Sequence, residues 1–179
     1  MKAEGYDAGA LPTDISATRL RDSPRVTRLF KEHASQIQPD YLKRGFAKLG
    51  EAWHSYMERH APDGWITERR FYAQVEGKIV SGAIDAIEPT DTGFKIWDYK
   101  LMTAWKAQTD LKEFEKQLNI YAFLLRQSGL NVEGLYISAV FGTGQTGRWV
   151  PEIILTLCSL CLNSHFGLLK RRQITFEIE

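Results

Sequence analysis

The sequence is poor in cysteine and lacks a long hydrophobic run. Its two cysteines, Cys158 and Cys161, are too few for the disulfide scaffold of a small secreted domain and suit a reducing compartment. The longest apolar run, residues 153–162, is about half of the ~20 residues that a membrane-spanning helix needs. The start, MKAEGYDAGALPTD, has acidic residues where a secretion signal has basic residues and then an apolar run. We therefore expect a cytoplasmic protein without membrane contact.

A strong excess of charge of either sign is also absent. The chain has 23 Lys and Arg against 22 Asp and Glu, a net charge of +1, which excludes a histone-like blanket of positive charge but not a local basic patch. The 179 residues, 44% hydrophobic and 25% charged, predict one soluble globular domain, 1–179, without internal repeats. Residues 1–15 show no periodicity and are predicted to form a loose lead-in.

Hydrophobic spacing predicts helices and strands in a mixed order. Apolar residues recur at helical spacing over residues 39–60 and 109–127. Strand-like runs cover residues 71–75, 78–88, 94–101 and 135–141. The turn sequence PTDTG joins the second and third of these runs and predicts an antiparallel hairpin. The order helix, three strands, helix, strand predicts an α/β fold, a sheet layered by helices.

The hairpin carries charged residues in a largely apolar setting. Asp98 and Lys100 of WDYK lie two residues apart and share one face of the strand, while Tyr99 points to the other face. Asp85 of GAIDAIE lies where strand pairing can place it beside Asp98. Two carboxylates in this setting need a partner, and Mg²⁺ or Mn²⁺ would provide one. A structural salt-bridge cluster of Asp85, Asp98 and Lys100 is the alternative that the hairpin alone leaves open.

Four segments in order resemble motifs of the PD-(D/E)XK nuclease superfamily, in particular of its RecB-like exonuclease branch. They are LGEAWHSYME around His54, GAIDAIE around Asp85, WDYK with Asp98 and Lys100, and QLNIY with Gln117 and Tyr121. The resemblance covers residues 49–141. It implies a restriction-endonuclease-like core, an α/β fold with a central mixed β-sheet flanked by helices. Ile84 stands where the family pattern nominally has proline.

The resemblance also implies roles for the matching residues. The implied metal ligands are His54, Asp85, Asp98 and the backbone carbonyl of Tyr99. The implied catalytic residues are Asp85, Asp98, Lys100, Gln117 and Tyr121. Lys100 would position the attacking water, and Gln117 and Tyr121, one helical turn apart, would face the site and hold DNA or Lys100. Each of three residues also has a structural interpretation without a role in catalysis. His54 could be an exposed residue of its helix, Tyr121 could belong to the hydrophobic core, and Gln117 could be a solvated helix residue.

Further residues are candidates for supporting roles. Glu68, just before the first strand-like run, is a candidate acid beside the metal ligands or at a second metal. Candidates for contacts with DNA phosphates and bases are Arg19, Arg21, Arg25, Trp105 and Lys106. The alternative for each charged residue is an ordinary solvated surface position.

Two other patterns are interpreted as structural. The literal G-x-G-x-x-G at residues 142–147 lacks the following βαβ unit and acidic residue of a dinucleotide site, and we interpret it as a loop at the rim of the DNA cleft. Cys158, Cys161 and His165 offer three ligands, whereas a structural zinc site needs four. The apolar run at 153–162 is predicted to complete the core or to form an oligomer interface.

These observations predict a Mg²⁺- or Mn²⁺-dependent DNA nuclease that attacks the phosphodiester with a metal-activated water. We expect an exonuclease of phage or prokaryotic recombination or repair. A structure-specific or nicking endonuclease on the same fold and a catalytically silent DNA-binding subunit are the alternatives. DNA is the expected partner, and a second copy of the chain and a recombination or repair protein are further candidates.

Overall fold

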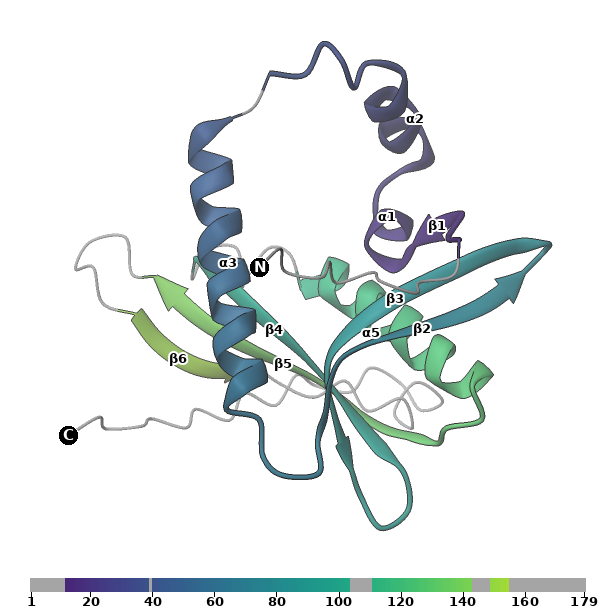
Figure 1. Ribbon diagram of the computed structural model, residues 1–179, viewed down its shortest axis with the longest axis vertical. Coiled ribbons are helices and arrows are strands. Elements are labelled where there is room, and N and C mark those ends of the chain that lie inside the picture. Colours follow the sequence, from purple (N-terminus) through teal and green to yellow (C-terminus); the bar gives the residue numbers. More distant parts are fainter. Residues whose placement is uncertain (1–11, 39, 104–110, 143–148, 155–179) are drawn as a thin grey trace, which may run out of the picture.

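A mixed β-sheet with helices on both sides forms the centre of the protein (Figure 1). The computed structural model describes residues 12–38, 40–103, 111–142 and 149–154. Within these ranges the strands are β1 (Ile15–Ser16), β2 (Ile66–Val75), β3 (Lys78–Pro89), β4 (Phe94–Thr103), β5 (Val132–Gly142) and β6 (Trp149–Ile154). The helices are α1 (Ala17–Arg21), α2 (Pro24–Glu32), α3 (Tyr41–Arg59) and α5 (Leu111–Gln127).

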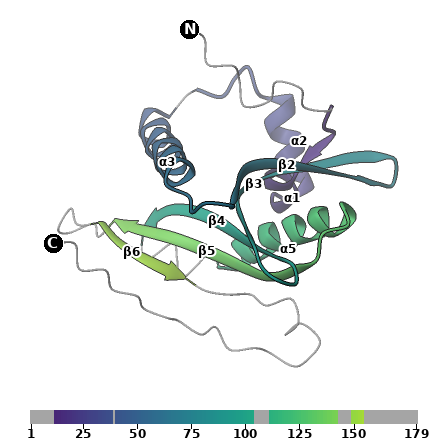
Figure 2. The same ribbon diagram turned by 60° about the horizontal axis from the view of Figure 1, so that its bottom comes forward.

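The sheet divides at β3. On one side, β3 pairs antiparallel with β2 along most of its length. On the other side, its beginning pairs in parallel with β1, and its residues 86–89 pair antiparallel with β4. β5 then pairs in parallel with β4, and β6 pairs antiparallel with β5. Figure 2 shows the β2–β3 pair extending away from β4, β5 and β6, so that the sheet is forked.

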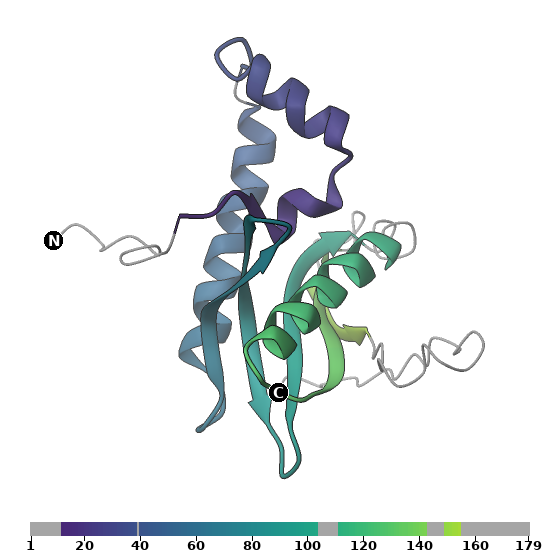
Figure 3. The same ribbon diagram turned by 90° about the vertical axis from the view of Figure 1, so that its right-hand side faces the viewer.

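The helices α3 and α5 lie on opposite sides of the sheet (Figure 3). α5 connects the parallel strands β4 and β5, since parallel neighbours need a crossover connection. Its inner face is apolar and contacts β2, β3, β4 and β5. α3 contacts β3 and β4, and α1 packs against α5 and β3. The two strands that carry the predicted metal and catalytic residues are therefore held between two helices.

The core lies between α5 and the sheet. Its fully buried aliphatic side chains are Ile84, Ile87, Ile96, Leu118, Leu124, Leu125 and Leu135. Each contributes about 1.5–3 kcal/mol relative to an exposed position. Gly82 lets α5 approach β3 closely, because a Cβ atom at this position would lie 2.8 Å from Cε1 of Tyr121. This packing fixes α5 against β3 three residues from Asp85.

The structure differs from the expected loose lead-in at residues 13–15. The backbone N–H of Asp14 donates to the carbonyl of Ile79 at 3.0 Å, and its carboxylate accepts the N–H of Ile79 at 2.8 Å. Thr13 Oγ1 donates to Oγ of buried Ser81 at 3.0 Å. These hydrogen bonds join residues 13 and 14 to residues of β3 that are more than 60 positions away in the sequence. Local periodicity therefore cannot predict them.

The expected α/β fold, a central mixed sheet flanked by helices, is confirmed. The helix predicted at 39–60 is α3, the helix predicted at 109–127 is α5, and the hairpin is β3–β4. The short elements β1, α1 and α2, and the strand β6 that contains Pro151, add to the predicted order. No helix in the part of the chain that the structure describes is long and apolar enough to cross a membrane.

Candidate active site

The sheet opens beside the charged residues of the β3–β4 hairpin. The two strands pair from Pro89 with Phe94 to Ala86 with Trp97, where their recorded pairing ends. Beyond this last pair of residues, Oδ2 of Asp85 accepts a hydrogen bond from the backbone N–H of Tyr99 at 2.7 Å. A buried backbone donor thus has a side-chain acceptor at the fork. The hydrogen bond holds the Asp85 carboxylate against the middle of WDYK.

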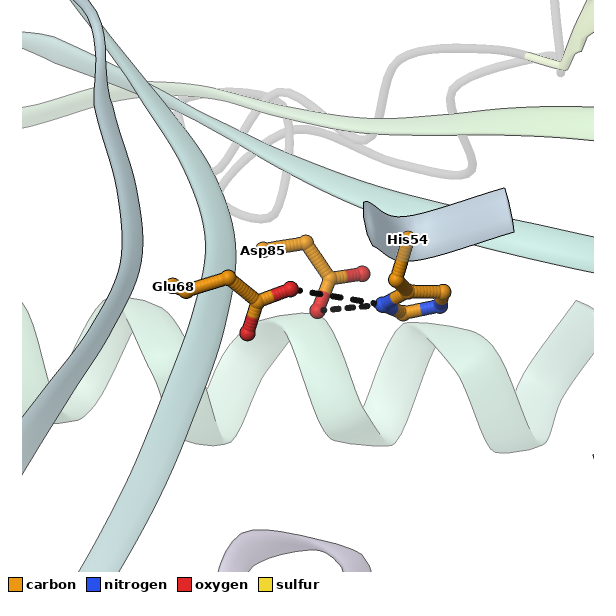
Figure 4. A group of neighbouring side chains, drawn as sticks. All are labelled: His54, Glu68 and Asp85. Carbon is orange, nitrogen blue, oxygen red and sulfur yellow. Dashed lines mark ion pairs between the residues drawn. The ribbon is translucent and has the colours of Figure 1, made fainter. Parts of the chain in front are cut away.

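His54, Glu68 and Asp85 converge at this fork from α3, β2 and β3 (Figure 4). Nδ1 of His54 lies 3.6 Å from Oε1 of Glu68 and 3.5 Å from Oδ1 of Asp85. The ligand atoms of the three residues all lie within 4.8 Å of one another. His54 reaches the two acids because α3 packs against β3 and β4. It is therefore not an exposed helix histidine without neighbours, which was the structural interpretation of this residue.

Glu68 reaches the group through an unusual backbone conformation. The β2–β3 pairing passes from Thr67 with Ala86 to Arg69 with Ile84, so Glu68 stands opposite Asp85 at a gap in the ladder. Its φ angle is +48°, a left-handed conformation that costs a residue with a side chain about 1 kcal/mol or more. The sequence suggests only an acid near the metal ligands. Its left-handed backbone has no sequence signal, because glutamate rarely adopts that conformation.

Burial and charge change the proton affinities of the group. Burial and the negative charge of Asp98 raise the pKa of Asp85 to about 7. The neighbouring carboxylate of Glu68 raises the pKa of His54 above its ordinary value of 6.5, and the charge of Asp85 adds to this effect. Burial, with the charges of Asp85 and Glu68, raises the pKa of Tyr99 to about 12. Negative charge is thus in excess around these side chains.

Asp98 and Lys100 form an ion pair next to this group. Nζ of Lys100 lies 2.6 Å from each carboxylate oxygen of Asp98 and donates a hydrogen bond to Oδ1. Asp98 is fully buried, whereas the Lys100 side chain keeps 20% of its surface exposed. Oδ2 of Asp98 is buried without a hydrogen-bond partner among the described residues. Asp98 is not part of the three-residue group, although the family resemblance implies it as a metal ligand.

Gln117 and Tyr121 are buried on α5. Nε2 of Gln117 donates to the hydroxyl of Tyr121 at 2.5 Å. Gln117 is therefore not the solvated residue of the alternative interpretation, and its Oε1 has no hydrogen-bond partner within the described part of the chain. Tyr121 packs against Gly82 of β3. The pair connects α5 to the strand that carries Asp85.

The three-residue group fits a divalent cation. It offers one imidazole nitrogen and two carboxylate oxygens, and oxygen-rich sites of this kind suit Mg²⁺ and Mn²⁺. Burial, and then the charge of Asp98, raises the pKa of Asp85, and a bound cation would favour the charged form of this carboxyl group. The Asp98 carboxylate, which is ion-paired with Lys100, adds negative charge in the same region. His54, Glu68 and Asp85 would hold such an ion.

The basic residues of the N-terminal part occupy a different surface. Arg19 and Arg21 lie on α1 and Arg25 lies on α2, while Trp105 and Lys106 lie outside the described residues. A cavity of about 1400 Å³ lies between α1, α2 and α3. Its charged lining is balanced, with the basic residues Arg19, Arg28, Lys31 and Arg44 and the acidic residues Asp14, Asp22, Glu32 and Asp40. Among the lining residues that the structure describes, the cavity therefore lacks the positive excess typical of a phosphate-binding channel.

Comparison with known proteins identifies the family. No curated protein sequence matches the chain. Among solved structures, the crystal structure of SSO0001 matches with a TM-score of 0.56 and 20% sequence identity, covering 80% of this chain and 68% of that one, which supports the restriction-endonuclease-like fold. The family model described as the PD-(D/E)XK nuclease superfamily matches residues 6–146, a range that includes His54, Glu68, Asp85, Asp98 and Lys100. The chain belongs to the PD-(D/E)XK nuclease superfamily.

Proposed function

We propose that this protein is an exonuclease of the RecB-like branch that degrades DNA with Mg²⁺ or Mn²⁺ in phage or prokaryotic recombination or repair. Membership of the superfamily supports a metal-dependent nuclease with DNA as substrate. The observation that carries the proposal is the convergence of His54, Glu68 and Asp85 beside the Asp98–Lys100 ion pair. A cation at such a site can activate water and stabilise charge on the phosphate, and a positioned ammonium group can orient the attacking water.

Each residue of the site has a role that its surroundings support. His54, Glu68 and Asp85 would hold the divalent ion, and the hydrogen bond from Tyr99 keeps the Asp85 carboxylate in place. The bound ion would supply positive charge to the scissile phosphate and make a water molecule easier to deprotonate. Lys100, whose ammonium group is held by the buried Asp98 carboxylate and whose side chain is partly exposed, would orient the attacking water. Glu68 therefore joins the predicted ligands, and Asp98 acts through Lys100.

The direct test uses linear duplex DNA and covalently closed circular DNA side by side, with Mg²⁺ or Mn²⁺. An exonuclease removes only the linear DNA, and the reaction stops in EDTA. Asp85→Asn is the matched inactive variant, since an amide oxygen still accepts the Tyr99 N–H while the charge is lost. Cutting of the circle as well would favour an endonuclease. Binding without cleavage of either DNA would favour a silent DNA-binding subunit.

A further inference from the structure

Three aromatic rings form a stack across the sheet. The rings of Trp65 and Trp97 have centroids 5.6 Å apart with 29° between their planes, and those of Trp97 and Tyr136 are 4.5 Å apart with 17° between their planes. The three residues come from the segment before β2, from β4 and from β5. All three side chains are partly exposed. The three rings are thus partly accessible to solvent and are not part of the buried core.

Strand register and one carboxylate hold the middle ring. Trp97 is the direct partner of Tyr136 in the β4–β5 register and of Ala86 in the β3–β4 register. Because Ala86 ends at Cβ, it leaves space for Trp65 to reach the other face of the Trp97 ring. Nε1 of Trp97 donates to Oε2 of Glu88 at 2.9 Å, and Lys95 donates to the other oxygen of Glu88 at 2.8 Å. The stack is therefore built on a fixed ring.

The stack lies beside the candidate active site. Trp97 directly precedes Asp98, and Trp65 lies three residues before Glu68. Trp97 and Tyr99 are two residues apart on β4 and share a face, and the Tyr99 ring centroid is 6.3 Å from that of His54. A nucleotide whose phosphate contacts a metal ion held by His54, Glu68 and Asp85 would lie on the part of the protein that carries the stack.

Only the outer rings can receive another aromatic group. Both faces of Trp97 are covered, one by Trp65 and one by Tyr136. Trp65 directly precedes β2, and β2 pairs with β3 alone among the described strands, so Trp65 stands at an edge of the sheet. We propose that the outer face of Trp65 stacks on the base of an unpaired nucleotide that adjoins the scissile phosphate. This inference rests on the proposed nuclease function.

Stacking on Trp65 defines the state of the DNA that the site takes. An internal base of a duplex has both faces covered by its neighbours, whereas a base in a single strand or a frayed end offers a free face. Every base has a face that can stack on an aromatic side chain, so this interaction depends little on the nucleotide sequence. It also needs no contact between the protein and a phosphate. The site therefore selects single-stranded DNA or opened ends, without a base preference.

The test measures binding in the inactive Asp85→Asn protein, so that the probes are not cut. One probe is a fluorescent oligothymidylate, and the other is an oligomer of the same length with abasic sugars. Trp65→Leu should weaken binding of oligothymidylate about tenfold and leave binding of the abasic oligomer unchanged. Unchanged binding of oligothymidylate, or equal losses with both probes, would overturn the inference. Trp65→Phe keeps a smaller ring, so it should weaken binding of oligothymidylate less than Trp65→Leu does and leave binding of the abasic oligomer unchanged.

Two controls separate folding and the nuclease function from this result. Tyr41→Leu removes the aromatic ring of a residue that is 81% exposed at the start of α3 and should not change either affinity. If Trp65→Leu fails to fold, Trp65→Phe is compared with the Asp85→Asn protein on both probes. Because phenylalanine has a smaller ring, Trp65→Phe should weaken binding of oligothymidylate and leave binding of the abasic oligomer unchanged. Equal binding of oligothymidylate by the two proteins would then overturn the inference. Cleavage by the wild type is measured separately. If the wild type does not cleave DNA but Trp65→Leu weakens binding of oligothymidylate alone, the nuclease function is rejected and the stacking site is retained.

Discussion

The carboxylate of Asp85 accepts the backbone N–H of Tyr99 at the point where β3 and β4 separate. This hydrogen bond spans the two motifs that hold the candidate active site and fixes an acid whose burial is costly. The fold therefore keeps a carboxylate with a raised pKa where a cation can bind.

Asp85→Asn should reduce the pH dependence of stability in metal-free protein. The pKa of Asp85 is about 7 in the folded chain, against an ordinary value of 3.8. The folded chain binds this proton more tightly than the unfolded chain does. The protonated Asp85 therefore stabilises the folded state fully at pH values below its pKa in the unfolded chain. This stabilisation is lost as the pH rises through its pKa in the folded chain. Stability of the wild type should therefore fall from about pH 5 to about pH 8, and that of the variant should fall less.

Thermal unfolding in EDTA at the two pH values checks this expectation. Asp91→Asn, which changes an exposed aspartate in the turn after β3, is the control and should behave as the wild type. Equal pH dependence in wild type and Asp85→Asn would contradict the raised pKa.

His54→Ala should change the metal preference of the protein. An imidazole ligand favours Mn²⁺ over Mg²⁺, since Mg²⁺ prefers oxygen ligands. We expect the wild type to bind Mn²⁺ more tightly than Mg²⁺ and the variant to lose most of this difference, as measured by calorimetric titration. His33→Ala, at the exposed end of α2, is the control. A preference that survives in His54→Ala would place the histidine outside the metal site.

Lys100→Ala should abolish cleavage and also destabilise the fold. Removal of the ammonium leaves the fully buried carboxylate of Asp98 without its counter-charge, which costs about 3–5 kcal/mol. The double variant Asp98→Asn/Lys100→Met should recover most of the stability and remain inactive. Urea unfolding and a cleavage assay on the three proteins separate the two effects. Recovery of cleavage in the double variant would exclude Lys100 from the reaction.

Glu68→Gly should weaken metal binding without loss of stability. Glycine adopts the φ angle of +48° without strain, so Glu68→Gly should be about 1 kcal/mol more stable than Glu68→Ala. Both variants should bind Mn²⁺ less tightly than the wild type. Glu76 has a φ angle of +47° in the turn between β2 and β3, and Glu76→Gly should relieve the same strain with metal binding unchanged. Wild-type affinity in Glu68→Gly would remove Glu68 from the ligands.

Gly82→Ala should destabilise the protein by about 1–3 kcal/mol. The added Cβ would lie 2.8 Å from Cε1 of Tyr121 and 2.9 Å from Cδ1 of Leu124, both of which are buried. Gly45→Ala on α3 is the matched control, because a Cβ there meets nothing within 4 Å, and it should stabilise the helix by about 0.5–1 kcal/mol. The free energy of unfolding in urea measures both changes. Tolerance of alanine at Gly82 would show that α5 can move away from β3.

Hydrophobic periodicity determined the long elements of this protein, because spacing along the chain sets which face of a helix or strand is apolar. It predicted α3, α5 and the β3–β4 hairpin, and the motif resemblance directed attention to His54, Asp85, Asp98 and Lys100. These features are visible in the sequence because each depends on residues that are close along the chain.

Tertiary structure alone decided which of these residues meet. The sequence separates His54 from Asp85 by the whole of β2, and only the packing of α3 on the sheet brings them within 3.5 Å. The left-handed backbone of Glu68 and the stacking of Trp65 on Trp97 have no local pattern. Both arise from contacts between strands, whose free energy depends on partners that are distant in the chain.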